Sequence, residues 1–295
     1  MTNVILITGA GTGIGKLAAE SLARAGHIVY ASMRDVNGRN ASRADGFRQW
    51  AKDQNVELHP LELDVLSQDS ADAAVATIVK QQGRIDVVIQ NAGHLVIGPT
   101  EAFTAEEIMK VFDTNFYGAH RVSRAVLPQM RARASGLVLW ISSSTTKGGF
   151  PPFMGPYAAA KAAMDSLAVS MSYELTRFGI ETSIVVPGAF TRGTDHFPSS
   201  GKPADVARNA AYARYDGVMD KVGERLSALT PDDADPQAVA DEIVRIVGLP
   251  QDCRPARSVI DFVGDGAAEV LEVSERVRIS FAKRIGIDDL LHVNL

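Results

Sequence analysis

The sequence predicts an α/β fold in which a parallel sheet of about seven strands carries helices on both faces. Short apolar runs rich in β-branched residues alternate with longer segments of helical pattern, as in repeated βαβ units. The first apolar run leads into a glycine-rich turn and then a helical pattern, which is typical of nucleotide-binding domains. With 295 residues, 46% of them hydrophobic, the chain can bury one large core.

The first unit is the clearest. Residues 4–7 are a continuous apolar run, as expected of a strand buried on both faces. The turn that follows reads Thr8-Gly9-Ala10-Gly11-Thr12-Gly13-Ile14-Gly15, and residues 16–25 are expected to be helical. Glycines let the backbone approach a phosphate closely, and a helix start offers free N–H groups. The unit therefore predicts a dinucleotide site, although its spacing is neither that of a P-loop nor G-x-G-x-x-G.

The other elements continue the alternation. Strands are expected at residues 27–33, 56–63, 85–90, 137–142 and 180–186, with a candidate seventh at 257–263, and helices at 41–53, 69–82, 104–133 and 157–178. We expect residues 1–295 to form a single domain. An insertion at about 188–235, helical at 204–229, interrupts the alternation, and an extension occupies about 264–295. The amphipathic pattern at 269–285 indicates a surface helix, a lid or an oligomer contact.

Composition and charge argue against several classes of function. A formal net charge of −5 without any block of like charge argues against a nucleic-acid surface. No apolar run reaches the roughly 18 residues that span a bilayer, and no room is left for a signal peptide. Cys253 is the only cysteine, which favours a reducing compartment, so a cytoplasmic protein is predicted. The histidines lack metal-binding spacing, and no metal site is expected.

Tyr157 and Lys161 point most directly to chemistry. They lie four residues apart, which places a phenol and an ammonium on one face of a helix. A nearby cation favours the phenolate and lowers the pKa of tyrosine from about 10 toward neutrality. Such a pair suits reversible proton transfer to a carbonyl or alcohol oxygen.

Four further motifs follow the glycine-rich turn in the expected order: Asp64-Val65, Asn91-Ala92-Gly93, Asn115 within Asn115-Phe116-Tyr117-Gly118, and Pro187-Gly188. With the turn and the Tyr-Lys pair, they resemble the short-chain dehydrogenase/reductase (SDR) family over about residues 3–190. The resemblance implies a Rossmann-like doubly wound sheet, a nicotinamide cofactor and interconversion of a ketone or aldehyde with an alcohol. It also implies a homodimer or homotetramer packed through the two long helices, and an insertion that covers the substrate.

By the same resemblance, the catalytic residues are Asn115, a serine, Tyr157 and Lys161. Tyr157 would be the general acid in reduction and the base in oxidation, and Lys161 would lower its pKa and bind the nicotinamide ribose. Asn115 would hold a water that links Lys161 to solvent, unless it simply bends its helix through a local hydrogen bond. Counting along the preceding strand selects Ser143 as the serine, whereas counting back from Tyr157 selects Ser144. We favour Ser143 because loops absorb insertions more readily than strand ends.

The end of the second strand bears on the choice of cofactor. Family members that use NAD carry an acid where Met33 stands, and Arg34 follows where a guanidinium can meet a 2′-phosphate. Asp35 is one residue too far along to face the ribose. We therefore expect NADP rather than NAD, although an ion pair between Arg34 and Asp35 would leave the preference open.

Members of the family usually carry a threonine five residues after the proline of the Pro-Gly pair, where it touches the nicotinamide carboxamide. Arg192 occupies that place here, so we expect the preceding Thr191 to make the contact instead. The cofactor-binding residues expected are Thr8, Gly9, Gly11, Thr12, Gly13, Ile14, Gly15, Arg34, Asp64, Val65, Asn91, Ala92, Gly93, Tyr157, Lys161, Pro187, Gly188 and Thr191.

The segments expected to face the substrate are rich in apolar side chains, namely Phe150, Pro152, Phe153, Met154, Phe190 and Phe197. Such walls favour an uncharged apolar substrate, and the residues indicate an NADP-dependent carbonyl reductase or alcohol dehydrogenase. Arg192 and Lys147 leave open an acidic or carrier-bound substrate such as a 3-oxoacyl thioester. A non-catalytic redox sensor that binds the dinucleotide is the alternative from another class.

Overall fold

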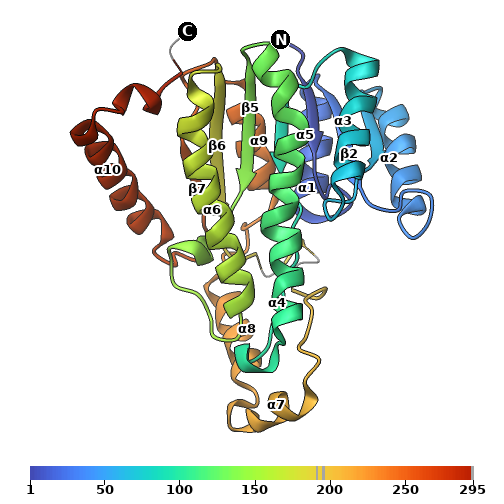
Figure 1. Ribbon diagram of the computed structural model, residues 1–295. Helices are drawn as coiled ribbons and strands as arrows, with labels where there is room; N and C mark the ends of the chain where they lie inside the picture. The colour runs from blue at the N-terminus through green and yellow to red at the C-terminus, as the bar shows by residue number, and fades with distance from the viewer. Residues whose placement is uncertain (191, 195–196, 294–295) are drawn as a thin grey trace.

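The computed structural model describes residues 1–190, 192–194 and 197–293, and within them it shows a seven-stranded parallel sheet between two layers of helices (Figure 1). The strand order is β3-β2-β1-β4-β5-β6-β7. The strands are β1 (Val4–Ile7), β2 (Ile28–Met33), β3 (Leu58–Glu62), β4 (Val87–Gln90), β5 (Gly136–Ile141), β6 (Ile180–Pro187) and β7 (Arg257–Ile260). The predicted fold class is confirmed, while β3 and β7 are shorter than expected.

The central strand β1 separates two apolar cores. Val4 and Leu6 belong to the core beneath α3 (Gln68–Gln82), α5 (Gly118–Ala132) and α6 (Gly155–Thr176). Ile5 and Ile7 belong to the opposite core, beneath α1 (Gly13–Arg24), α2 (Ala41–Gln54) and α9 (Gln237–Gly248). Because successive side chains of a strand point to opposite faces, a strand covered on both sides must be apolar throughout.

The position of β1 also determines where a ligand can bind. β1 pairs with β2 on one side and with β4 on the other, so the chain connections diverge from it in opposite directions. In open α/β sheets, this divergence leaves a crevice beyond the carboxyl ends of the strands. The glycine-rich turn after β1 and the Asn-Ala-Gly motif after β4 meet at this crevice.

The long helix expected at 104–133 is interrupted. The structure has α4 (Ala105–Phe112), a π-helical turn η2 (Asp113–Tyr117) and then α5. Asn115, within that turn, donates from Nδ2 to the carbonyl oxygen of Val111 four residues earlier, at 2.9 Å. A side chain that takes a helix carbonyl diverts it from the regular backbone ladder. Such π-helical turns frequently occur at functional sites.

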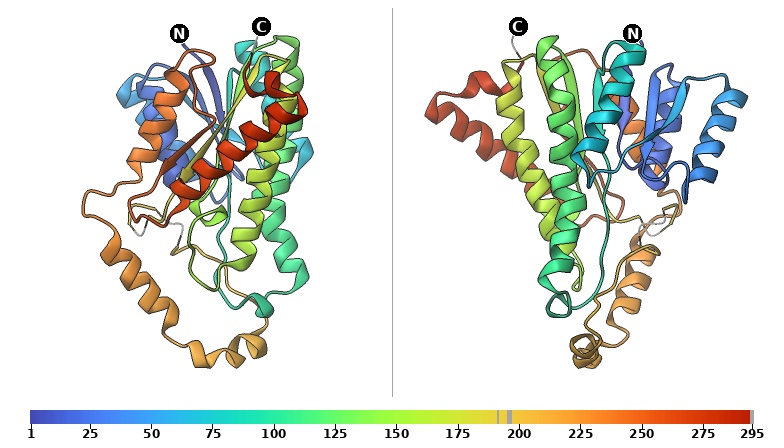
Figure 2. Two further views of the ribbon diagram at one scale, coloured as in Figure 1. Left: turned by 90° about the vertical axis from the view of Figure 1, so that its left-hand side faces the viewer. Right: turned by 45° about the vertical axis from the view of Figure 1, so that its right-hand side comes forward.

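The insertion forms an arm that projects beyond the sheet (Figures 1 and 2). Instead of one helix at 204–229, it contains α7 (Val206–Ala211), η4 (Ala213–Tyr215) and α8 (Val218–Leu229), with Gly217 at a φ of 72° before α8. The arm is tied to the body where Gly201 exchanges backbone hydrogen bonds with Leu95 and Ile97, both at 2.9 Å. The remaining elements are α10 (Ala267–Ile285) and short 3₁₀ turns at η1 (Thr100–Ala102), η3 (Ser144–Thr146) and η5 (Asp288–Leu291). None of the helices in the described ranges is long and apolar enough to cross a membrane.

Candidate active site

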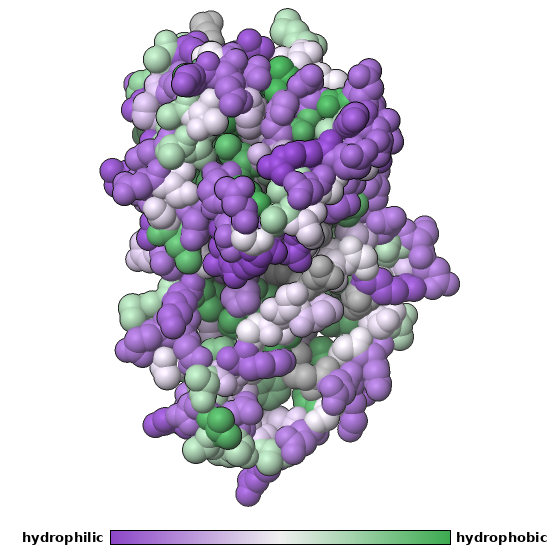
Figure 3. Space-filling view, turned by 90° about the vertical axis from the view of Figure 1, so that its right-hand side faces the viewer, coloured by the Kyte–Doolittle hydropathy of each residue, from purple (hydrophilic) through white to green (hydrophobic). Residues whose placement is uncertain are grey.

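A cavity of about 740 Å³ lies at the carboxyl ends of the strands, between the sheet and the arm. The space-filling view shows a hollow between the main body and the arm, with hydrophobic side chains visible inside it (Figure 3). Its lining comes from the glycine-rich turn, from the loops that follow β2 to β6, from α6 and from the arm. The cavity therefore joins the predicted dinucleotide site to the predicted catalytic helix.

The glycine-rich turn is fixed by the motif that follows β4. Thr8 Oγ1 accepts the backbone N–H groups of Asn91 and Ala92, each at 3.0 Å. Asn91 Nδ2 donates to the carbonyl oxygens of Thr8 and Gly9 at 2.9 and 3.0 Å. These bonds tie together two segments that are about 80 residues apart in the sequence, and they hold the turn at the end of the sheet.

At two positions of this turn only glycine fits, because a side chain would collide with the motif that follows β4. Gly9 has a φ of 64°, and a Cβ atom there would lie 2.8 Å from the Cα of Ala92. A Cβ atom on Gly15 would lie 2.4 Å from Asn91 Nδ2. The backbone at the start of α1 is consequently open to the cavity, where free N–H groups and the helix dipole favour a phosphate. This turn fits the pyrophosphate of a dinucleotide.

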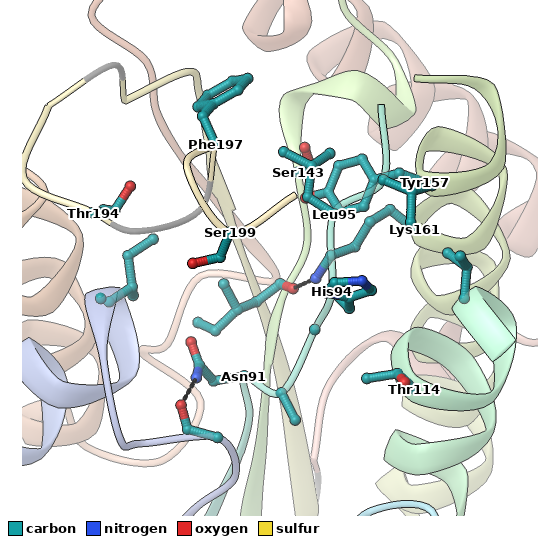
Figure 4. A pocket seen from close by; sticks show the side chains of 18 of the residues that line it. Asn91, His94, Leu95, Thr114, Ser143, Tyr157, Lys161, Thr194, Phe197 and Ser199 are labelled. Carbon is teal, nitrogen blue, oxygen red and sulfur yellow. Dashed lines mark hydrogen bonds between the residues drawn. The ribbon is translucent and has the colours of Figure 1, made fainter. Parts of the chain in front are cut away.

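The structure brings together nearly all the residues predicted to bind the cofactor. Thr8 is buried directly beneath the turn, and Thr191 lies outside the described residues. Thr194, three residues further on, lines the cavity (Figure 4). The other predicted cofactor-binding residues all line the cavity, namely Gly9, Gly11, Thr12, Gly13, Ile14, Gly15, Arg34, Asp64, Val65, Asn91, Ala92, Gly93, Tyr157, Lys161, Pro187 and Gly188.

Two arginines line the end of the cavity next to β2. Arg34 follows the strand, and Arg43 comes from α2, where its Nη1 donates to Asn40 Oδ1 at 2.6 Å. Asn40 Nδ2 in turn donates to the carbonyl oxygen of Arg34 at 2.6 Å, so one amide side chain links both arginines. Asp35 is turned into its own loop, where its carboxylate accepts the backbone N–H of Arg39 at 3.0 Å. The alternative of an ion pair between Arg34 and Asp35 is not observed between these two described residues.

Tyr157 and Lys161 lie side by side on α6, with Ser143 next to the phenol (Figure 4). Tyr157 is hydrogen-bonded to Ser143, which stands directly after β5. Lys161 Nζ donates to the carbonyl oxygen of Ile141, the last residue of β5, at 2.8 Å. Ser144 also lines the cavity, as part of the 3₁₀ turn η3. Ser143, the serine favoured from the sequence, therefore contacts the phenol, and the choice between Ser143 and Ser144 as the catalytic serine stays a prediction.

The ionisation of this pair differs from the sequence-based expectation. Burial raises the pKa of Tyr157 to about 12, and the hydrogen bond with Ser143 offsets part of that rise. Burial lowers the pKa of Lys161 to about 8, against the opposing effect of the Asp165 carboxylate. The expected lowering of the Tyr157 pKa is therefore wrong for this structure, because charging a phenol that is only 5% exposed costs more than its polar neighbours return.

A buried ion pair supports the catalytic helix from below. The Asp165 carboxylate accepts Arg257 Nη1 and Nη2 at 2.6 and 2.9 Å, and the hydroxyl of Ser142 at 2.7 Å. Asp165 lies one turn beyond Lys161 on α6, Ser142 immediately precedes Ser143, and Arg257 opens β7. Lys161 and Asp165 therefore hold the end of β5 at two points, which fixes how Ser143 faces the phenol.

Asn115 links the π-helical turn to the loop after β4. It is fully buried, donates to the carbonyl oxygens of His94 and Val111 at 3.0 and 2.9 Å, and accepts the backbone N–H of His94 at 3.2 Å. The local hydrogen bond that bends the helix is observed for Asn115, while its predicted catalytic role stays a prediction. A Cβ atom on Gly93 would lie 2.9 Å from Asn115 Oδ1 and 3.6 Å from Lys161 Nζ, so these groups surround one small space.

Much of the cavity lining beyond the glycine-rich turn is apolar. Its apolar residues are Leu95, Val96, Phe103, Met154, Phe190, Phe197, Leu226 and Val263. Of the other aromatic residues predicted there, Phe150 is half exposed and Phe153 packs against Tyr212 and Tyr215 of the arm. Neither Arg192 nor Lys147 lines the cavity, and Lys110 and Lys202 do so instead.

Sequence reasoning missed Arg43 and Asp165. Asp165 continues the four-residue spacing of Tyr157 and Lys161, so the helical pattern could have placed it on the same face. Arg43 carried no comparable signal, because its approach to Arg34 depends on how α2 packs against the sheet.

Comparisons with known proteins agree with this geometry. A family model described as short chain dehydrogenase matches residues 3–203. A 3-ketodihydrosphingosine reductase of Bacteroides thetaiotaomicron is 36% identical over 191 residues, which cover 64% of this chain and 65% of that protein. Estradiol 17-beta-dehydrogenase 1 of Rattus norvegicus is 36% identical over 221 residues, covering 72% of this chain and 62% of the rat protein. The chain therefore matches less than two thirds of the length of either relative. An uncharacterised oxidoreductase of Bacillus subtilis is 30% identical over 245 residues, 82% of this chain and 84% of that protein.

Solved structures show the same fold. A short-chain dehydrogenase from Streptomyces avermitilis superposes with a TM-score of 0.73 at 28% identity, over 97% of both chains. A variant of actinorhodin polyketide ketoreductase solved with NADPH gives a TM-score of 0.72 at 25% identity, over 90% of this chain and 97% of the other.

The fold, the order of the motifs and the cavity they share lead to one assignment. The chain belongs to the short-chain dehydrogenase family, and the named relatives above are dehydrogenases and reductases.

Proposed function

We propose that the protein is an NADP-dependent carbonyl reductase, and in reverse an alcohol dehydrogenase, for an apolar substrate. The observation that carries the proposal is the convergence of Tyr157, Ser143 and Lys161 on a cavity that also contacts the glycine-rich turn. A carbonyl group placed against the phenol would lie within one cavity with the dinucleotide site. The bound nicotinamide would supply the hydride in reduction and accept it in oxidation.

Tyr157 is the general acid in the reductive direction. Since its pKa is raised to about 12, the phenol is protonated at neutral pH and ready to donate to the carbonyl oxygen. Ser143 donates a hydrogen bond to the same oxygen and stabilises its developing negative charge. Lys161, still largely protonated below about pH 8, stabilises the phenolate that remains after proton transfer. Asn115 keeps the neighbouring loop in place and accepts a water through its remaining oxygen lone pair.

The preference for NADP is supported by Arg34 and Arg43. Arg34 and Arg43 both line this end of the cavity, and Asn40 bonds to the backbone of the first and the guanidinium of the second. Two guanidinium groups there suit a 2′-phosphate, which accepts charge-assisted hydrogen bonds. No carboxylate among the described residues stands at the end of β2 to repel this phosphate. Met33 occupies that position, and the Asp35 carboxylate accepts a backbone N–H within its own loop. Both features favour NADP over NAD.

The apolar wall supports a substrate that is uncharged along most of its length. The names of two relatives, an estradiol dehydrogenase and a ketodihydrosphingosine reductase, agree with such a substrate. The arm at about 188–235 would cover it, because Phe197 and Leu226 reach the cavity from that segment.

A carrier-bound 3-oxoacyl thioester is the second candidate substrate. Lys110 and Lys202 line the cavity, and neither has an ion-pair partner among the described residues. Two unpaired cations beside an apolar cavity suit an acyl chain attached to a phosphate-containing carrier. The comparison with a polyketide ketoreductase points the same way.

The proposal is tested by measuring NADPH and NADH oxidation with a panel of ketones, diketones, steroids and acyl thioesters. We expect turnover with NADPH, with kcat/KM rising as the apolar part of the ketone lengthens. Equal or faster turnover with NADH across the panel would contradict the assignment of Arg34 and Arg43. Activity confined to thioesters would replace the first substrate class by the second.

A further inference from the structure

The outer face of α10 carries an apolar stripe that is about half exposed to solvent. It consists of Val270, Val273, Val277, Phe281 and Ile285, which are 46%, 48%, 59%, 55% and 51% exposed. At 100° per residue, these five side chains fall within an arc of about 120°, so they form one continuous stripe along the helix. The stripe is much larger than the isolated exposed apolar residues that ordinary surfaces carry, and it indicates an interaction surface.

The helix itself is firmly attached to the body. Ala267, Leu271 and Ala282 are buried on its inner side. Arg278 lies over the ring of Tyr173 on α6, 5.1 Å from its centroid. Figure 2 shows α10 lying across the outside of the molecule, beside α6. The stripe is therefore presented by a fixed helix, away from the cavity.

The stripe is nearly symmetric about Val277. Val273 and Phe281 lie four residues to either side, and Val270 and Ile285 lie seven and eight residues away. In an antiparallel pair of identical helices related by a two-fold axis, Val277 would meet its own copy, and each small Val273 would meet a large Phe281. Two-fold contacts require this kind of self-complementary surface.

The exposed charges beside the stripe are complementary in the same arrangement. Glu269 lies near the start of α10 and Arg284 near its end, both on the same flank of the stripe. An antiparallel pair would set each acidic end beside the basic end of the other copy and would also oppose the two helix dipoles.

We propose that α10 is a self-association surface that packs antiparallel against α10 of a second copy of this chain, with Val277 on the two-fold axis. The 19 residues of the helix extend about 28 Å. A contact of that length is at the small end of protein interfaces. The two long helices α5 and α6, on which the family resemblance places oligomer contacts, are a separate surface.

Cysteine cross-linking tests the geometry. In full-length protein with Cys253→Ser, Val277→Cys should form a disulfide-linked dimer on mild oxidation, because residue 277 meets itself. Val270→Cys and Ile285→Cys should each stay uncross-linked alone, since their copies lie about 22 Å apart, but the two proteins mixed should give a mixed dimer. Cross-linking of all single variants to the same extent, or none with Val277→Cys, overturns the proposal.

Measurements of molar mass and of vesicle binding test whether the stripe binds a second copy of the chain. Val277→Glu should halve the molar mass seen by light scattering at 50 to 100 µM, whereas Val206→Glu, at an exposed apolar residue of α7, should not change it. Glu269→Lys and Arg284→Glu should each weaken association by about fivefold, and together they should restore it. An unchanged mass with Val277→Glu overturns the proposal. The proposal is also overturned if the unmodified protein sediments with phosphatidylglycerol vesicles and Val277→Glu abolishes that sedimentation. The stripe would then bind a membrane surface and not a second copy of the chain.

Discussion

The two walls of the cavity are built in different ways. On the sheet side, Thr8, Asn115, Ser143 and Lys161 are all less than 10% exposed, and Thr8 and Lys161 are hydrogen-bonded to the backbone of β4 and β5. On the arm side, α8 has no buried side chain among its described residues. The arm meets the body through hydrogen bonds at Gly201, Ala204 and Tyr212, and Tyr212 and Tyr215 pack against Phe153. Segments with little buried apolar surface open more easily than core strands. Under the proposed function, proton transfer belongs to the rigid wall and substrate selection to the adaptable one.

The largest effect should come from the rigid wall. Tyr157→Phe removes the proton donor but keeps the ring, so kcat/KM for ketone reduction should fall by about 10² to 10⁴. NADPH affinity, measured by fluorescence titration, should stay within about threefold. Ketone reduction that survives with only a few-fold loss would show that another group donates the proton.

The next effect concerns the end of the cavity beside β2. Arg34→Ala and Arg43→Ala should each raise the KM for NADPH by about 10- to 100-fold, as expected for loss of a hydrogen bond to a charged group. The KM for NADH should change little. Arg39→Ala, in the same loop but outside the cavity lining, is the matched control. An equal rise in the KM for NADPH and the KM for NADH would mean that the arginines stabilise the loop and do not bind the 2′-phosphate.

The third prediction uses the buried ion pair. Because the pKa of Lys161 is about 8, its stabilising charge is present below that pH and lost above it, so reductive kcat/KM should decline above about pH 8. Asp165→Asn removes the charge that holds this pKa up and should move the decline to lower pH, with about a tenfold loss of activity at pH 8. Ser142→Ala, which keeps the carboxylate, should leave the position of the decline unchanged. If kcat/KM of Asp165→Asn depends on pH as it does in the unmodified protein, Asp165 does not set the pKa of Lys161 and has only a structural role.

Asp165→Asn should also lower stability. It leaves the buried Arg257 without a charged partner, which costs about 3 to 5 kcal/mol. Urea unfolding checks this cost, and activity should be compared at temperatures where the variant is folded.

The smallest effect belongs to the arm. Leu226→Ala removes part of the apolar wall, so the KM for long apolar ketones should rise by about fivefold, with kcat nearly unchanged. Short ketones should show no change. Leu229→Ala, on the same helix but outside the cavity lining, is the control. A fall in kcat for every substrate would instead give the arm a part in closing the site for chemistry.

What the sequence predicted well depends on local geometry. The turn from Thr8 to Gly15 requires glycines where the backbone comes close to Ala92 and Asn91, and the spacing of Tyr157 and Lys161 follows from one helical turn. Strand and helix order follow from apolar patterns in the same way. α9 was missed as an element, and the break of the arm helix at Gly217 was not foreseen.

The sequence by itself determined the fold class, the family, the phosphate-binding turn and the Tyr-Lys pair, because each is encoded within a few residues. Only the tertiary structure decided that Ser143 bonds to the phenol, that Asp165 and Arg257 support Lys161, and that Arg43 joins Arg34. It also reversed the expected pKa of Tyr157. The physical reason is common to all of these: contacts between residues far apart in the sequence, and the loss of solvent around a buried group, arise only when the sheet and its helices pack together.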